Sequence, residues 1–481
     1  MARMARIQMT LAVRLGLVGI CLIYPLLTHA ADSPWPAEVK GWKKPEPGEH
    51  PRLLFRRWEL PEIRKRAETR EGKAILKRLR FLLDGKDGET LLPAGQPPQT
   101  IGAFTIGHAA GYGLLYQLSG EKKYADLGLQ CFDRMLKGEA DRDGRYSFTN
   151  PNGELRAGSS WAVAALGYDL CYDGWSEADR IRIAKAFLNV KAGQGFNLEK
   201  VVRQPKYRPA KNHTGGIMCG AVAAAALAGD PGTEGVKIWE EWLPDAYKNT
   251  IGMLTKGFGD HGWYAESQGP SHVSSDTGFQ LWLKSAKIAC GKDFISPRPN
   301  AQYIALRWVM EIIPQDGRPQ YPLRMAANPS YGTHEFTRAG DWSHGGQFAQ
   351  GFGIVEDQYK PALLWVYQNF VEPAEHALTP KESWVNEKGF LTKTEKSYDA
   401  LVSPLESGAG VRELADRRGG EESRRHSAPS DGGPHSRLLL LSQSLEGRGR
   451  YRGDGTSRLR PEGRLQAEVR TGRRMGPRQA V

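Results

Sequence analysis

The chain has 481 residues, of which 40% are hydrophobic and 25% are charged, and its formal net charge at pH 7 is +12. Residues 1–30 carry +3 of that charge and residues 411–481 carry +7, which leaves +2 for residues 31–410. The body of the protein is therefore nearly neutral, so its net charge gives no argument for a nucleic-acid ligand, and we expect none.

Residues 1–30 are typical of a secretory signal peptide. Two arginines precede an apolar run over residues 11–27, and the small residues Thr28 and Ala30 flank the site where we expect cleavage. The alternative is a retained N-terminal anchor, although the run is short and interrupted for a membrane span. No later segment is apolar enough to cross a bilayer, so we expect a secreted or periplasmic protein without a membrane partner.

Residues 31–397 read as a series of helices joined by loops rich in Gly and Pro. Ser176 is a predicted N-cap because an acidic residue follows three positions later. The segment 221–228 is almost entirely alanine and should pack closely against its neighbours. The expected helices span residues 53–83, 104–118, 123–136, 155–171, 176–190, 213–228, 236–258, 272–290, 301–313 and 361–370. Such a series indicates a mainly α fold, either an (α/α) toroid of paired helices or a related helical array.

Four cysteines follow the leader, and they are widely spaced in mostly apolar surroundings. They are Cys131, Cys171, Cys219 and Cys290. No Cys-x-x-Cys or metal-like spacing appears among them. We expect buried free thiols, and two disulfides are the alternative.

Residues 398–481 differ in composition from the rest of the chain. Arg, Gly, Ser and Pro dominate, the last lysine is Lys396, and Tyr451 is the only aromatic residue after Val411. One interpretation is a disordered basic tail. The simultaneous loss of lysine and aromatic residues favours the other, a GC-rich gene read out of frame. Neither predicts a packed domain.

Four segments together resemble the heparinase II/III family of polysaccharide lyases and the related alginate lyases. They are residues 50–55 (HPRLLF), residues 162–169 (AVAALGYD) with Trp175 and Ser176 after them, residues 211–216 (KNHTGG) and residues 259–266 (GDHGWYAE). The resemblance covers about residues 50–370. It implies that residues 31–397 form an α/α toroid and that the protein cleaves an acidic, uronic-acid-containing polysaccharide by β-elimination.

The chain also departs from the family's pattern. Complete relatives continue into a β-sandwich that packs on the toroid and commonly supplies another catalytic histidine. After residue 397 that domain is missing or scrambled, so the toroid is incomplete and the activity of this polypeptide is in question.

The resemblance implies three catalytic residues, namely Asn212, His213 and Tyr264. β-Elimination removes the proton at C5 of the uronic acid, beside a carboxylate whose charge must first be neutralised. Asn212 would hydrogen-bond that carboxylate. His213 would act as the base, because a free imidazole titrates near 6.5, and Tyr264 as the acid, because a free phenol titrates near 10. If proton and leaving group share one face of the sugar, Tyr264 could perform both steps.

Two further residues are supporting candidates. Glu266 could orient His213, and His272 is a second candidate for the acid. Simpler interpretations stay open for each residue. Asn212 could be only an N-cap, His213 a surface residue of a first helical turn, Tyr264 part of the core, and Glu266 a solvated loop charge.

A second group of polar residues lies between the helices expected at 301–313 and 361–370. Arg324 and Arg338 could pair with carboxylate or sulfate groups of the substrate, and Trp342 could stack on a sugar ring. His334, Asp341 and His344 are chemically able to hold zinc. However, the metal ligands of heparinase II come from its β-sheet domain, so we expect no metal and no other cofactor here. Structural salt bridges are the alternative.

The sequence leaves two other functions open. A toroidal glycoside hydrolase would use paired carboxylates, such as Asp260 with Glu266 or Asp169. An inactive carbohydrate-binding remnant would bind glycan without cleaving it. The sequence specifies neither the glycan nor the oligomeric state.

Overall fold

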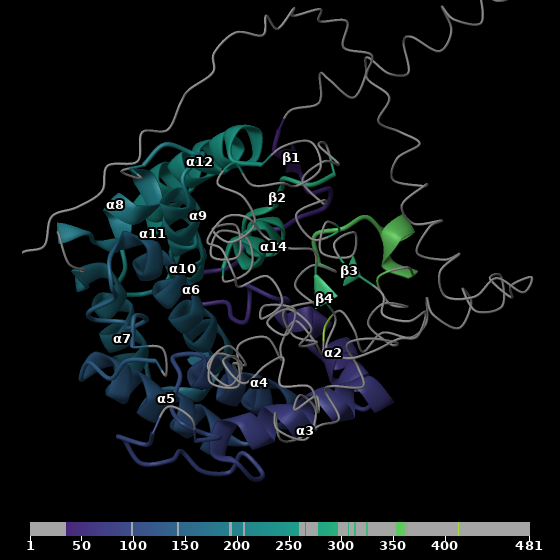
Figure 1. The fold of residues 1–481 in the computed structure, drawn as a ribbon, viewed down its shortest axis with the longest axis vertical. Coiled ribbons are helices and arrows are strands. Elements are labelled where there is room, and N and C mark those ends of the chain that lie inside the picture. The colour runs from purple at the N-terminus through teal and green to yellow at the C-terminus, as the bar shows by residue number, and fades with distance from the viewer. Residues whose placement is uncertain are drawn as a thin grey trace, which may run out of the picture. The chain divides into compact units, whose positions relative to one another are not determined.

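The computed structural model describes residues 35–97, 100–141, 144–191, 195–204, 207–258, 278–296 and 353–361, together with a few single positions between and after them. All of these residues lie within the first of two compact units, Met1–Pro434. As expected, the fold of this unit is mainly α (Figure 1).

The helices are described here in chain order. They are η1 (Arg57–Glu59), α2 (Leu60–Ala67), α3 (Arg70–Asp84), α4 (His108–Ser119), α5 (Lys122–Leu136), α6 (Glu154–Cys171), η2 (Tyr172–Gly174), α7 (Glu177–Asn189), α8 (Leu198–Arg203), α9 (Asn212–Met218), α10 (Gly220–Leu227), α11 (Gly235–Lys237), the π-helix η4 (Ile238–Trp242), α12 (Leu243–Lys256), α14 (Phe279–Cys290) and η7 (Asp357–Tyr359). In the described ranges, no helix has the length and hydropathy that crossing a bilayer requires.

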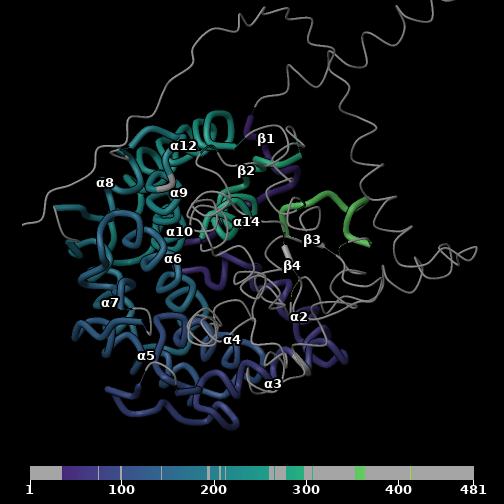
Figure 2. Tube along the Cα trace, in the orientation of Figure 1, coloured from purple at the N-terminus to yellow at the C-terminus, as the bar shows by residue number. Residues whose placement is uncertain are grey.

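Among the described residues, four strands of two residues each form two antiparallel pairs. β1 (Ala37–Glu38) pairs with β2 (Lys292–Asp293), and β3 (Ile312–Ile313) pairs with β4 (Arg324–Met325). The first pair brings the start of the described chain against the end of α14, which Figure 2 shows as purple beside teal. Two tryptophan side chains strengthen this contact. The indole of Trp35 donates to the carbonyl of Phe294 at 2.9 Å, and that of Trp42 to the carbonyl of Ile288 at 3.0 Å.

Helix α6 lies at the centre of the packing, between α4, α9 and α10 (Figure 1). Seventeen of its eighteen residues are buried, and Arg156 is the exception. A helix that is apolar on all sides belongs in the core rather than on the surface. The alanine-rich α10 is buried along its whole length, which confirms the predicted close packing of residues 221–228.

Several predicted helix boundaries agree with the structure. The helices expected at 155–171 and 176–190 correspond to α6 and α7. Ser176 is the N-cap of α7, and its hydroxyl accepts a hydrogen bond from the backbone N–H of Asp179 at 3.2 Å. The predicted capping signal is thus confirmed.

Other boundaries were wrong. The helix expected over 53–83 is divided into α2 and α3, because Thr69 caps a new helix by accepting from the N–H of Gly72. The helix expected over 213–228 is divided at Cys219, which ends α9 and precedes α10. Residues 312–313, expected to end a helix, form strand β3. The helices expected over 272–290 and 361–370 lie partly outside the described residues.

The four described cysteines, Cys131, Cys171, Cys219 and Cys290, are free and buried, as predicted. Burial disfavours the charged thiolate and raises the pKa of Cys219 and of Cys290 to about 12. We therefore expect none of the four to react with iodoacetamide at pH 8 in the folded protein, and all four to react in denaturant. Peptide mass spectrometry identifies the labelled positions, and rapid labelling of any of the four in the folded protein would contradict their burial.

Candidate active site

His213 lies in the first turn of α9 beside a buried carboxylate. Its side chain is 38% exposed, whereas that of Glu154, the first residue of α6, is 5% exposed. Nδ1 of His213 is 3.9 Å from Oε2 of Glu154. This distance is too long for a hydrogen bond but close enough for a charge interaction. The carboxylate can therefore stabilise the imidazolium that forms when His213 takes up a proton.

Tyr207 packs against the same imidazole. The two ring centroids are 4.6 Å apart, with the ring planes at 49°. The loop that carries Tyr207 is attached to α9 by Thr214, whose hydroxyl is 3.0 Å from the carbonyl oxygen of Tyr207 and 2.8 Å from that of Arg208. Glu154, Tyr207 and His213 thus form one group, which we call the His213 cluster.

Two glycines allow the close helix contact that assembles the His213 cluster. A Cβ at Gly158 in α6 would lie 2.2 Å from the carbonyl oxygen of Gly216 in α9. A Cβ at Gly216 would lie 2.3 Å from the carbonyl oxygen of Leu155. No larger residue fits at either position without moving the backbone. The missing side chains therefore let the first turns of α6 and α9 lie close together.

Asn212 is the first residue of α9, and the structure describes its backbone but not its side chain. The N-cap position is occupied by Lys211. This contradicts the simpler interpretation of Asn212 as only an N-cap. Its neighbour His213 fits one part of its own simpler interpretation, because it does lie in a first turn, but it is only partly exposed and has a buried carboxylate beside it.

Most of the other predicted site residues lie outside the described residues. These are Tyr264, Glu266, His272, Arg338 and Trp342, together with Asp260, His334, Asp341 and His344. Arg324 belongs to β4, where only its backbone is described. In the part of the chain that the structure describes, no group of three or more His, Cys, Asp or Glu side chains could hold a metal ion.

Glu154 and Tyr207 were missed by the sequence analysis. Glu154 follows Asn152-Gly153 and opens a helix whose middle part, residues 161–168, is apolar. A single carboxylate at the start of such a helix is a signal that could have identified it, because a buried charge requires a partner. Tyr207 lies in a loop without a distinctive pattern, so its position beside His213 could not be predicted.

A separate group of polar residues is buried at the N-terminal segment, and we call it the His50 network. Nδ1 of His50 is 2.7 Å from Asp169, and Nε2 is 3.0 Å from Asp230. Arg52 forms an ion pair with Asp230 at 2.7 Å, and the hydroxyl of Tyr168 donates to Asp230 at 2.8 Å. The side chains of His50, Arg52, Asp169 and Asp230 have no exposed surface. The network therefore cannot contact a polysaccharide.

The His50 network explains the HPRLLF segment of the sequence. The carboxylate of Asp169 accepts hydrogen bonds from the backbone N–H groups of Arg52 at 2.9 Å and of Leu53 at 3.0 Å, in addition to its bond with His50. Asp169 thus attaches the N-terminal segment to α6. This contradicts the alternative in which Asp169 is a hydrolytic carboxylate, because its oxygens are buried and already engaged.

The charge of Asp230 is held in place by its neighbours. Burial alone would raise the pKa of its carboxyl group, but the charges of Arg52 and His50 and hydrogen bonds from His50 and Tyr168 outweigh burial and lower this pKa. The same carboxylate and burial raise the pKa of Tyr168 well above its usual value. Asp230 is therefore an ionised, paired group inside the core.

Comparison with known proteins does not assign this site to a family. The sequence matches no family model, and a search among curated proteins also finds no match. The resemblance of residues 50–370 to the heparinase II/III family accordingly stays a prediction.

Proposed function

We propose that this protein is a polysaccharide lyase that cleaves a uronic-acid-containing glycan by β-elimination, with an incomplete α/α toroid as its scaffold. The observation that carries the proposal is the His213 cluster. A partly exposed imidazole beside a buried carboxylate is the arrangement that a general base needs, since the base must reach the substrate and be stabilised when protonated.

In the proposed reaction, Nε2 of His213 takes the proton from C5 of the uronic acid. The electron pair of the broken C5–H bond forms the C4=C5 double bond, and the C4–O bond breaks. Tyr264 gives its proton to the departing oxygen. Asn212 binds the uronic carboxylate and stabilises the charge that develops next to C5. No cofactor is required for this sequence of steps.

Glu154 acts through His213 rather than on the sugar. Its position on the Nδ1 side leaves the opposite nitrogen of the ring for the substrate. The ring of Tyr207 limits how far the imidazole can rotate. The sequence alone suggested Glu266 for the orienting role, and Glu266 lies outside the described residues; among the described residues, the position of Glu154 supports this role.

The remaining parts of the proposal concern the scaffold and its location. Helix α4 packs against α5, the next helix in the chain, and against α6, the one after it, which supports a toroid or a related array. Arg324, Arg338 and Trp342 would bind the acidic chain. Residues 1–30 would direct the protein to the periplasm or the outside of the cell, and residues 398–481 would contribute no packed domain.

The products of a glycan panel test this proposal. Alginate, heparan sulfate, ulvan and other glucuronate polymers are incubated with the full chain. We expect at least one to yield an unsaturated uronide, seen as a rise in near-ultraviolet absorbance. New reducing ends without that absorbance would indicate a hydrolase, and binding without any product would indicate an inactive remnant. Either outcome would overturn the lyase proposal.

A further inference from the structure

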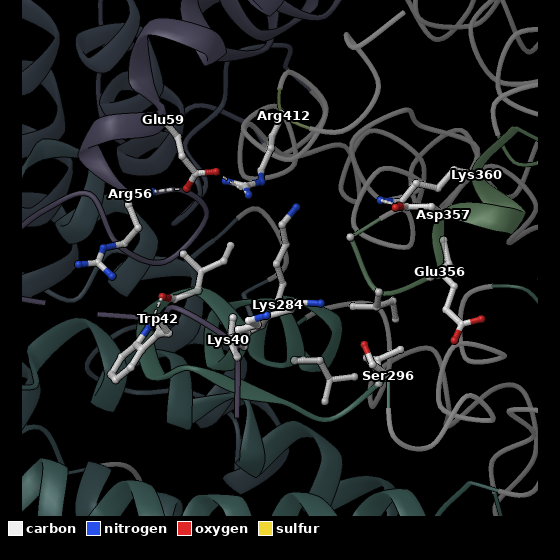
Figure 3. A pocket seen from close by; sticks show the side chains of 18 of the residues that line it. Lys40, Trp42, Arg56, Glu59, Lys284, Ser296, Glu356, Asp357, Lys360 and Arg412 are labelled. Atoms are coloured by element: carbon white, nitrogen blue, oxygen red, sulfur yellow. Dashed lines mark hydrogen bonds and ion pairs between the residues drawn. The ribbon is translucent and has the colours of Figure 1, made fainter. Parts of the chain in front are cut away.

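A second potential binding region is a pocket of about 1120 Å³ beside α14 (Figure 3). Its walls come from residues 39–43, from η1, from the second half of α14 and from residues 353–361. None of its lining residues belongs to the His213 cluster. Pockets for drug-sized ligands usually measure ~300–1,000 Å³. This pocket therefore has room for an oligomer rather than for a single small anion.

The lining of the pocket is predominantly cationic. Eight of the lining residues are Lys or Arg, and three are Asp or Glu. Figure 3 shows side chains such as Lys40, Lys284 and Lys360 around the same open space. The excess does not depend on Arg412, which lies in the segment of unusual composition, because seven cations remain without it. Since residues 31–410 carry a net charge of only +2, this positive charge is local.

Some of these cations are neutralised within the protein. Arg412 pairs with Glu59 at 2.9 Å, and Lys360 pairs with Asp357 at 2.7 Å. Carboxylates just outside the lining engage others in the same way. These pairs are Arg56 with Glu49, Arg66 with Glu62, and Lys287 with Asp293. Lys40 and Lys43 belong to none of these pairs, so a ligand would meet them first.

Lys40 and Lys43 are two lining residues of the pocket. Both side chains are exposed, and neither forms an ion pair with any residue that the structure describes. Lys284 lies deeper and is 5% exposed. A ligand that carries several anionic groups can thus meet both exposed and buried cations of the lining, and charge-assisted hydrogen bonds of this kind are the strong ones.

An exposed aromatic ring accompanies the cations. Trp58 is 63% exposed, which is unusual for so large an apolar side chain. The guanidinium of Arg56 lies 4.4 Å from the centre of its ring and holds the indole in place. A rigid, exposed indole offers an apolar surface against which the face of a sugar ring can pack.

From these observations we infer that this pocket binds an acidic oligosaccharide through Lys40, Lys43 and Trp58. Several carboxylate or sulfate groups would meet the cations, and the apolar face of one sugar would cover the indole. Single-stranded nucleic acid fits less well, because it uses a series of stacking aromatic rings along an extended basic groove. Here the second tryptophan, Trp42, is partly buried and abuts Gly291. The inference shares its ligand class with the proposed lyase activity.

The test measures binding to the full chain carrying His213→Ala, so that the ligand is not consumed. The probe is a fluorescently labelled alginate hexasaccharide, and its anisotropy gives the Kd. We expect the pair of substitutions Lys40→Gln and Lys43→Gln to weaken binding about tenfold, and Trp58→Ala to weaken it by about as much. Because charge carries the interaction, added salt should weaken binding to the parent more than to the double-lysine variant.

Lys185→Gln with Lys248→Gln is the matched control, since both lysines are exposed and lie outside the pocket. We expect this pair to change the Kd less than twofold. An equal loss of affinity in the pocket double variant and in the control double variant would overturn the inference. So would equal competition by neutral maltohexaose, displacement by an equal concentration of inorganic sulfate, or tighter binding of a single-stranded DNA dodecamer.

The outcome is separable from that of the lyase proposal. A chain that binds the hexasaccharide through the pocket lysines but forms no unsaturated product supports the pocket and overturns the lyase activity. If unsaturated product forms but binding does not change on substitution of Lys40, Lys43 and Trp58, the lyase proposal is supported and the pocket inference is overturned.

Discussion

Replacing His213 with alanine should lower the rate of unsaturated-uronide formation by about 10²–10⁴-fold, the usual contribution of a positioned acid–base group. The ring is partly exposed in the first turn of α9, so its loss should leave the fold intact. Near-ultraviolet absorbance measures the rate, and circular dichroism with a thermal melt verifies folding. Tyr264→Phe removes the proposed acid and should lower the same rate by a similar factor.

These two variants decide the assignment together. If both retain full turnover on a glycan that the parent cleaves, the proposed roles of His213 and Tyr264 are wrong. If only His213→Ala retains full turnover, the base lies elsewhere and the proposed role of the His213 cluster is wrong.

Glu154 offers a finer test, because we place it as a positioning residue. Glu154→Gln keeps the size of the side chain but removes the charge that stabilises the imidazolium. We expect kcat to fall about 10- to 100-fold, as is typical when a group that supports a functional residue is removed, while KM stays unchanged. Glu177→Gln makes the same chemical change at an exposed position of α7 and should leave both constants unaltered. A rise in KM without a fall in kcat would contradict the assignment.

Local patterns in the sequence were sufficient for much of the helical framework. The boundaries of α6 and α7 follow from apolar spacing and from the Ser176 cap, both of which involve residues within a few positions of one another. The burial of the alanine-rich segment and of the cysteines also follows from composition alone. Such features do not depend on where the rest of the chain lies.

Features that depend on distant residues were not predictable in the same way. The partners of His50 lie 119 and 180 positions further along the chain, so no local pattern shows that residues 50–53 form an anchor. Glu154 meets His213 because glycines in two different helices allow a close crossing. The cationic pocket is likewise assembled from segments that are hundreds of residues apart. The sequence identified one member of the candidate site, and only the packing of α6 against α9 revealed its partner.

The largest effect on stability is expected for Asp230 in the His50 network. Asp230→Asn removes the negative charge that Arg52 and His50 share, and leaves buried positive charge without its partner. Breaking a buried pair in this way costs about 3–5 kcal/mol of the free energy of unfolding. Urea denaturation at pH 7 measures this loss. Asp173→Asn is the matched control, because Asp173 forms a more exposed pair with Arg57 at 2.6 Å and should contribute only about 0–1 kcal/mol.

The pH dependence of the difference in unfolding free energy between the parent and Asp230→Asn is a second, independent measurement. The pKa of Asp230 is lower in the folded protein than the value of about 3.9 expected for an unfolded aspartate. Its carboxylate therefore stabilises the fold fully above that value, and the contribution is lost as the pH falls through the folded-state pKa. The stability gap between the parent and Asp230→Asn should accordingly be largest at neutral pH and shrink below pH ~4. A gap that stays constant down to acid pH, or that is no larger than the one for Asp173→Asn, would show that the His50 network does not hold the N-terminal segment through charge.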